Sequence, residues 1–141
     1  MKKKIVALDQ GEHIGGAEIF FSELLDHLAD FHEVHLITSR NPFYQSRYQK
    51  VKIHPIDFPP LRFWKLFSYF SVQDSIRKVL DRLKPDVILS NTVRTHLLVS
   101  KLAREMSIPL LWMAHDFTFP KFLLRYFIKF PKTIICCSKA V

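Results

Sequence analysis

Two neighbouring glycines have a spacing that suits the binding of an anion. Gly15 and Gly16 come directly before a segment with the apolar spacing of a helix. The free N–H groups at a helix N-terminus attract negative charge, and residues without side chains let a phosphate approach the backbone. The alternative is a tight turn between a strand and a helix that needs a positive φ angle. The residues alone leave both interpretations open.

A second polar group follows an apolar run at 86–90. It consists of Asn91, Thr92, Arg94 and His96. Short polar side chains beside a cation suit the recognition of hydroxyl groups or of an anionic group. The same residues would serve equally well as the capped loop between a strand and a helix.

The elements that must position these residues alternate along the chain. Apolar runs predict six strands, at 4–8, 34–37, 51–56, 86–90, 109–114 and 133–137. Helical spacing is found after Gly15, before Pro85 and over 95–106, and a polar loop is expected around 41–42. We therefore expect an α/β fold, a Rossmann-like doubly wound parallel sheet of about six strands, in a single domain over 1–141.

In such a sheet, ligands bind beyond the carboxyl ends of the strands. The segments 9–16, 90–96 and 115–119 are expected at that edge, and so is Ser138. Neither a dinucleotide fingerprint nor a phosphate loop with its lysine is present, which disfavours a nicotinamide enzyme and a nucleotidase. The histidines at other positions show no ligand spacing, so we assign no metal.

Positive charge is concentrated in the second half of the chain. The net charge is −1 over residues 1–60 and +9 over 61–141. In the segment 119–130, Lys121, Arg125 and Lys129 recur at intervals of four among aromatic and aliphatic residues, as in a helix that lies in a membrane interface. An ordinary helix whose basic side chains extend past an apolar face is the alternative. We favour contact with an anionic membrane surface.

The remaining composition indicates an ordinary protein of the reducing cytoplasm. Cys136 and Cys137 are adjacent, so neither a metal pair nor an ordinary disulfide is expected, and we expect two buried thiols. No segment approaches the roughly 18 apolar residues of a membrane-spanning helix. Ser138 has the position of a helix N-cap, and the helix would be incomplete at Val141, which suggests a truncated chain.

Four motifs together resemble glycosyltransferase family 4, which has the two-domain GT-B fold. They are Gly15-Gly-Ala-Glu18, Lys84-Pro-Asp-Val-Ile-Leu-Ser90, His115-Asp116 and Cys137-Ser-Lys-Ala-Val141, in the order and at the intervals of that family. The resemblance implies a retaining transferase whose N-terminal domain recognises the acceptor and whose C-terminal domain binds the nucleotide sugar. This chain would be the N-terminal domain. The donor-binding domain and its glutamate motif are absent from it, so the chain alone should be inactive or nearly so.

The resemblance also assigns roles to individual residues. His115 would contact the transferred sugar and help to stabilise the charge that develops during transfer. Asp116 would orient the His115 ring or bind an acceptor hydroxyl, or else cap the next helix. The substrate-binding set is Gly15, Gly16, Asn91, Thr92, Arg94, His96 and Ser138. No cofactor is implied beyond the nucleotide-sugar donor as co-substrate.

The expected function is transfer of a sugar to a glycan or lipid-linked acceptor in cell-envelope polysaccharide or glycolipid synthesis. The partners would be a donor-binding domain, in the same chain or another, and an anionic surface on the inner face of the cytoplasmic membrane. A second hypothesis is a non-catalytic module that presents an acceptor to a separate donor-binding chain. Nucleic-acid binding would fit the net charge of +8, but no motif supports it.

Overall fold

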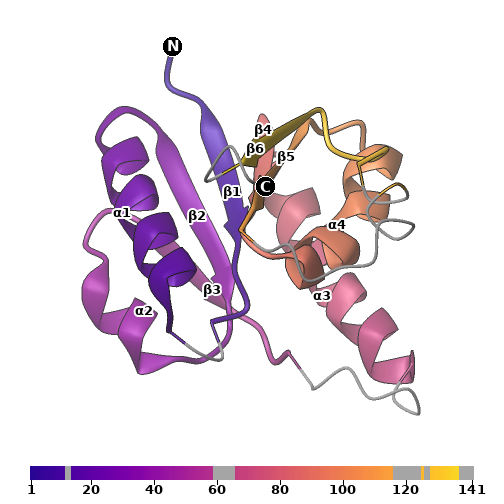
Figure 1. The fold of residues 1–141 in the computed structure, drawn as a ribbon, viewed down its shortest axis with the longest axis horizontal. Coiled ribbons are helices and arrows are strands. Elements are labelled where there is room, and N and C mark those ends of the chain that lie inside the picture. Colours follow the sequence, from indigo (N-terminus) through magenta and orange to yellow (C-terminus); the bar gives the residue numbers. More distant parts are fainter. Residues whose placement is uncertain (12–13, 59–65, 116–124, 126–127, 137–141) are drawn as a thin grey trace.

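The computed structural model describes residues 1–11, 14–58, 66–115, 125 and 128–136. Strands and helices alternate along most of the chain, as the apolar pattern predicts (Figure 1). The strands are β1 (Lys4–Leu8), β2 (Glu33–Thr38), β3 (Lys52–Pro55), β4 (Val87–Ser90), β5 (Leu110–Ala114) and β6 (Thr133–Cys136). The helices are α1 (Gly16–Phe31), α2 (Pro42–Arg47), α3 (Leu66–Leu83) and α4 (Val93–Glu105).

All six strands are parallel and form one sheet in the order β3-β2-β1-β4-β5-β6. The chain leaves β3 at one edge, passes along α3 and returns as β4 on the other side of β1. The strand order therefore reverses between β1 and β4, which is where ligands bind in sheets of this kind. The predicted doubly wound α/β fold is confirmed.

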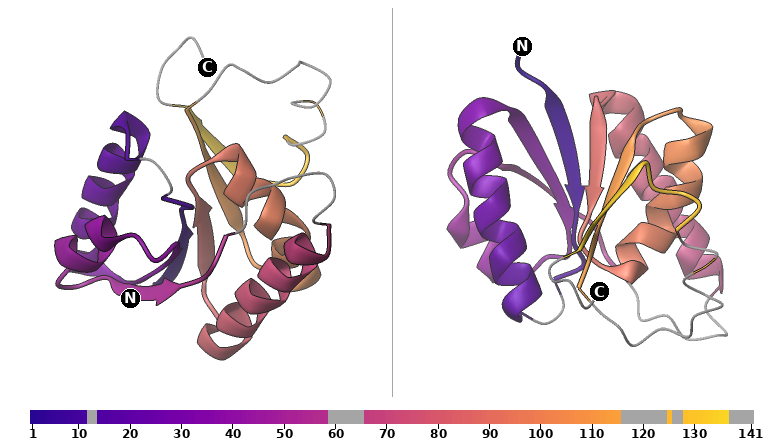
Figure 2. Two further views of the ribbon diagram at one scale, coloured as in Figure 1. Left: turned by 90° about the horizontal axis from the view of Figure 1, so that it is seen from below. Right: turned by 45° about the horizontal axis from the view of Figure 1, so that its top comes forward.

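Helices cover both faces of the sheet (Figure 2). The β1 side chains of Val6 and Leu8 pack with α3 and α4, whereas those of Ile5 and Ala7 pack with α1 and α2. Alternate side chains of one strand thus enter two different cores. This explains why β1 is apolar at successive positions rather than at alternate ones.

Two predictions about local structure are wrong. The segment expected as a polar loop contains α2, where Asn41 is the N-cap and its Oδ1 accepts from the Phe43 N–H at 2.9 Å. Pro42 is favourable there, because the N–H groups in the first turn of a helix have no partner within the helix, so proline loses no hydrogen bond. Cys136 is exposed instead of buried, since β6 is the edge strand of the sheet, while Cys137 lies outside the described residues.

Within the described ranges, no helix is both long enough and apolar enough to cross a membrane.

Candidate functional site

A cavity of about 270 Å³ lies at the carboxyl edge of the sheet, beside the point where the strand order reverses. Its walls come from the N-terminus of α1, the junction between β4 and α4, and the residue after β5. The lining residues are Gly15, Gly16, Ala17, Glu18, Asn91, Thr92, Val93 and His115. The fold therefore brings together five of the predicted site residues from three separate parts of the chain.

Gly15 and Gly16 have no structural need for a missing side chain. Gly15 has a φ of −119°, and the described glycine with a positive φ is Gly11, at 61°. A Cβ at Gly16 would meet no atom within 4 Å, and one at Gly15 would meet only Glu18 Oε2, at 3.2 Å. The turn interpretation thus applies to Gly11, and the space beside Gly16 is open to a ligand.

Glu18 occupies part of the helix N-terminus in this structure. Its Oε2 accepts a hydrogen bond from the Gly15 N–H at 2.9 Å. A Glu three residues after the N-cap position is a standard partner for this N–H, so the sequence contains a signal for the contact. An anion that uses the Gly15 N–H must displace the Glu18 carboxylate.

Thr92 is the N-cap of α4. Its Oγ1 accepts from the Thr95 N–H at 3.2 Å, and the Thr92 N–H donates to Thr95 Oγ1 at 3.1 Å. This double contact is a capping box, with threonine in the place of the usual glutamate. The capped-loop interpretation is therefore correct for Thr92, which lines the cavity as well.

His115 and Asn91 are in direct contact. His115 Nε2 lies 2.8 Å from Asn91 Oδ1, and Asn91 is fully buried. The Phe20 and His115 rings form a T-shaped pair, with 6.4 Å between their centroids, and about half of Phe20 is exposed. The His115 ring is thus held between a buried amide and an exposed aromatic side chain.

Asp9 is a buried carboxyl group at the same edge, directly after β1. Its side chain has no exposed surface, and the Tyr44 hydroxyl donates a hydrogen bond to its Oδ2. Burial raises the pKa of Asp9, while the hydrogen bond from Tyr44 and the nearby polar groups of Asn91 and the Gly11 backbone act in the opposite direction. The sequence pattern places Asp9 at this edge but assigns no role to it. A charged residue directly after a buried strand could have indicated that Asp9 belongs to the site.

His96, which is predicted to bind substrate, does not line the cavity. His96 is fully buried, and its ring stacks on that of Trp112, with 4.7 Å between the centroids. Because α4 begins at Val93, position 96 falls on the helix face that packs against the sheet. Arg94, on the first turn of α4, is half-buried and is not part of the cavity wall.

Three other predicted residues, Asp116, Lys121 and Ser138, lie outside the described residues. Of the proposed membrane-contact set, Arg125 and Lys129 are described, and both are exposed. Among the side chains that the structure describes, no three His, Cys, Asp or Glu residues are grouped in a way that could hold a metal ion.

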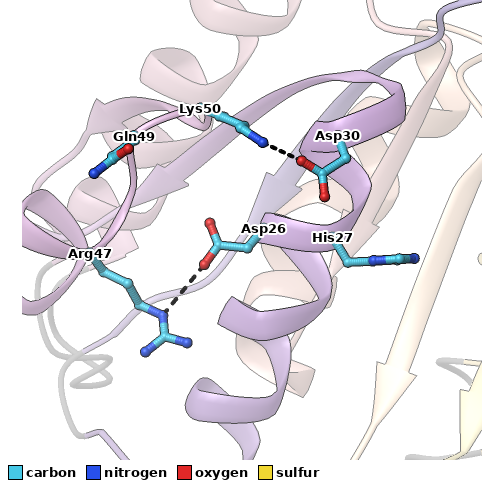
Figure 3. A pocket seen from close by; sticks show the side chains of 6 residues that line it. All are labelled: Asp26, His27, Asp30, Arg47, Gln49 and Lys50. Carbon is cyan, nitrogen blue, oxygen red and sulfur yellow. Dashed lines mark hydrogen bonds and ion pairs between the residues drawn. The ribbon is translucent and has the colours of Figure 1, made fainter.

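A larger cavity, of about 470 Å³, lies between α1, α2 and the start of β3 (Figure 3). Its charged groups pair with each other, Arg47 with Asp26 at 3.9 Å and Lys50 with Asp30. It lies beside the C-terminal half of α1, away from the carboxyl edge of the sheet. Because its cations and carboxylates are mutually compensated and far from His115, we favour the smaller cavity as the functional site.

Comparison with known proteins assigns the chain to a family. The model of Glycosyltransferase Family 4 matches residues 14–141. No protein of curated function matches the sequence.

Three solved structures share the fold at low identity. Anabaena HepE, solved in complex with UDP-glucose, has a TM-score of 0.77 and 20% identity over 98% of this chain and 38% of its own. Acinetobacter baumannii MurG has a TM-score of 0.71 and 16% identity, over 95% and 41%. Rickettsia bellii UDP-N-acetylglucosamine 2-epimerase has a TM-score of 0.73 and 13% identity, over 99% and 40%. The chain thus spans about two fifths of the structures that it resembles.

Proposed function

Because this chain belongs to glycosyltransferase family 4, we propose that it is the acceptor-side domain of a retaining glycosyltransferase. Its fold is that of the N-terminal half of GT-B enzymes. An epimerase shares the fold, so the fold alone does not select the reaction. The family and the cavity together support sugar transfer.

The observation that carries this proposal is the meeting of Gly15, Gly16 and His115 around one cavity at the carboxyl edge of the sheet. In sugar transfer, the bond from the anomeric carbon to the phosphate oxygen of the nucleotide breaks. A bond to the acceptor hydroxyl oxygen forms, and the hydroxyl proton leaves with the diphosphate. Negative charge therefore grows on the leaving phosphate while positive charge grows on the sugar.

The two sides of the cavity suit these two charges. The N–H groups at the start of α1 are placed to receive the phosphate oxygens, once the Glu18 carboxylate has moved away. His115 lines the same cavity, and we assign to it the contact with the transferred sugar. Asn91 and Thr92 line the same cavity, where Asn91 contacts His115 and Thr92 caps α4. Asp116 and Ser138 complete the proposed site.

The donor is a nucleotide sugar, held by a donor-binding half in the same natural chain or in another. HepE was solved with UDP-glucose, and this chain spans 38% of HepE. Both facts support a second half that holds the donor. On this proposal, residues 1–141 alone have little or no transferase activity.

The acceptor is a glycan or a lipid-linked sugar of the cell envelope, reached at the inner face of the cytoplasmic membrane. The net charge of +9 over 61–141 and the exposed Arg125 and Lys129 support attraction to an anionic leaflet. Co-sedimentation with anionic and neutral vesicles tests this part. Binding should favour anionic vesicles and weaken when Lys121, Arg125 and Lys129 are replaced by Glu, and equal recovery with both vesicle types contradicts it.

The test of the function is a transfer assay with labelled nucleotide sugars and envelope lipid extract, on the natural protein that contains these residues and on residues 1–141 alone. We expect label in a glycan or lipid product, with the anomeric configuration of the donor retained, from the natural protein only. Binding of an acceptor without transfer from any nucleotide sugar would instead support a non-catalytic presenting module.

A further inference from the structure

Phe20 is an aromatic side chain that is exposed beside the candidate site. It stands at the start of the second turn of α1, and 52% of its surface is exposed, whereas the next residue, Phe21, is fully buried in the core. Ile14 and Ile19 are exposed as well, so apolar surface gathers at this end of α1. Apolar surface that gathers in one place marks a site of contact more reliably than a single exposed side chain does.

The position of the Phe20 ring follows from the geometry of α1. Phe20 comes four residues after Gly16, so the two residues lie on the same side of the helix. Helical side chains lean toward the N-terminus, and the ring therefore extends over the turn that begins at Gly16. A Cβ at Gly16 would meet no atom within 4 Å, so the space beside this turn is open.

The ring lies at the rim of the cavity. Gly16 and His115 both belong to the cavity wall, and the Phe20 ring pairs with the His115 ring at 6.4 Å between centroids. Phe20 itself is next to this wall and not part of it. A molecule that enters the cavity between Gly16 and His115 therefore passes the Phe20 ring.

Phe20 offers a chemistry that complements the polar groups of the cavity. The wall supplies backbone N–H groups, an amide, a hydroxyl and an imidazole, which suit hydroxyl and phosphate oxygens. A pyranose ring also has an apolar face of C–H groups, which forms no ordinary hydrogen bonds. The face of an aromatic ring is slightly negative, so it attracts the hydrogens of these C–H groups and shields them from water.

We propose that Phe20 is a specificity-determining residue, on whose ring the apolar face of a pyranose stacks at the rim of the cavity. Its value for catalysis rests on the sugar transfer proposed above, although the stacking itself requires only that a sugar binds here. The transferred sugar and the acceptor sugar both contain such a ring. The experiments therefore distinguish these two sources.

The direct test is the binding of simple sugars to residues 1–141, followed by NMR on ring-labelled phenylalanine. The probes are the methyl glycosides of glucose, galactose, mannose and N-acetylglucosamine. The Phe20 ring signals, which are identified by their loss in Phe20→Leu, should shift saturably with at least one of them. From the amide signal of Gly16, Phe20→Leu should raise the Kd of that glycoside by about fivefold, whereas Phe20→Tyr, which retains the aromatic face, should stay within about twofold of wild type.

Phe31 is a matched control on the same helix. It lies on the same side of α1 about three turns further on, and it is 63% exposed. It too forms a T-shaped pair with a histidine, His27, at 5.5 Å between centroids, but His27 does not line the candidate site. The Phe31 signals should not shift, and Phe31→Leu should bind the glycoside as wild type does.

Two outcomes of the binding experiment overturn the proposal. One is the absence of a Phe20 shift with all four glycosides. The other is an equal shift at Phe31, which would show that the sugars contact exposed aromatic rings without specificity.

Kinetics of the natural protein identify which sugar uses the ring. Phe20→Leu should raise KM for one substrate by about fivefold and change kcat by less than about twofold, because a stacking contact is made in the ground state and the transition state alike. An increase for the acceptor alone assigns the ring to the acceptor sugar, and an increase for the nucleotide sugar alone assigns it to the transferred sugar. Both results support the proposal.

Other kinetic results contradict it. A fall in kcat at unchanged KM would show that Phe20 acts only through His115. An equal increase in KM for both substrates would show general damage to the site. Either result refutes stacking of a sugar on Phe20.

The two experiments also separate this proposal from the proposed function. Glycoside binding that depends on Phe20, in a natural protein without transferase activity, would refute sugar transfer and retain the stacking. Transferase activity with unchanged KM values in Phe20→Leu would retain the function and refute the stacking.

Discussion

Gly16→Ala separates stability from function at the candidate site. Gly16 is the first residue of α1 and lines the cavity. A Cβ added there meets no atom within 4 Å, so the substitution causes no clash. Alanine also loses less conformational freedom than glycine when a helix forms, by roughly 0.5 to 1 kcal/mol. The free energy of unfolding should therefore rise by about 0.5 kcal/mol, because the first turn gains less than a helix interior.

For a chain of this size, that change corresponds to an increase in Tm of about 1–2 °C. The transferase activity should change in the opposite direction, because the new methyl group stands where a phosphate must approach the backbone. We expect kcat/KM of the natural protein to fall by at least about tenfold, the equivalent of ~1.4 kcal/mol.

Calorimetry on residues 1–141 and a transfer assay on the natural protein measure the two effects separately. A lower Tm would show that the glycine is needed for the fold, which contradicts the geometry of the turn. A stable variant with wild-type kcat/KM would refute contact between a ligand and the start of α1. Ser46→Ala, at an exposed position on α2, controls for the effect of a surface substitution.

Three further predictions concern the scaffold. Gly11→Ala should lower the free energy of unfolding by about 2 kcal/mol or more, because φ at this position is 61° and the new Cβ would lie 2.3 Å from the Tyr44 ring. Urea unfolding measures this change, and a loss below about 0.5 kcal/mol would contradict the close contact. Asn41→Ala should lower the free energy of unfolding by about 1 kcal/mol, because α2 loses its N-cap. An unchanged urea midpoint would show that this contact does not stabilise the protein. Burial lowers the pKa of His35 from 6.5, so below about pH 6.5 the unfolded chain binds the proton more readily. The free energy of unfolding should therefore be highest above about pH 6.5 and should fall as the pH is lowered. The fall should be less steep in His35→Leu, and equal pH dependence in the two proteins would contradict this prediction.

The sheet and its order of elements can be predicted because burial on both faces makes the strands apolar at successive positions. Helix α2 escapes such a prediction, since six residues with one buried side chain give too short a periodic signal. Its capping signal, Asn41 followed by Pro42, is present but is equally typical of a loop. The prediction for Cys136 is wrong for a different reason, because a strand's position at the edge of a sheet is not visible in its own sequence.

The candidate site is predictable in part because parallel strands end at a common edge. That rule is enough to place His115, Asn91 and the two glycines together from the sequence alone. It does not distinguish His96 from Thr92, since the difference depends on the residue at which α4 begins.

The measurement that tests the central claim most directly is sugar transfer by the natural protein with His115→Ala, compared with wild type and with His27→Ala. His27 is an exposed histidine on α1 in the other cavity, packed edge-on against Phe31, and it serves as the matched control. We predict that kcat falls by at least about 100-fold in His115→Ala, the equivalent of ~2.7 kcal/mol, and changes less than about twofold in His27→Ala. Unchanged turnover in His115→Ala would contradict the account.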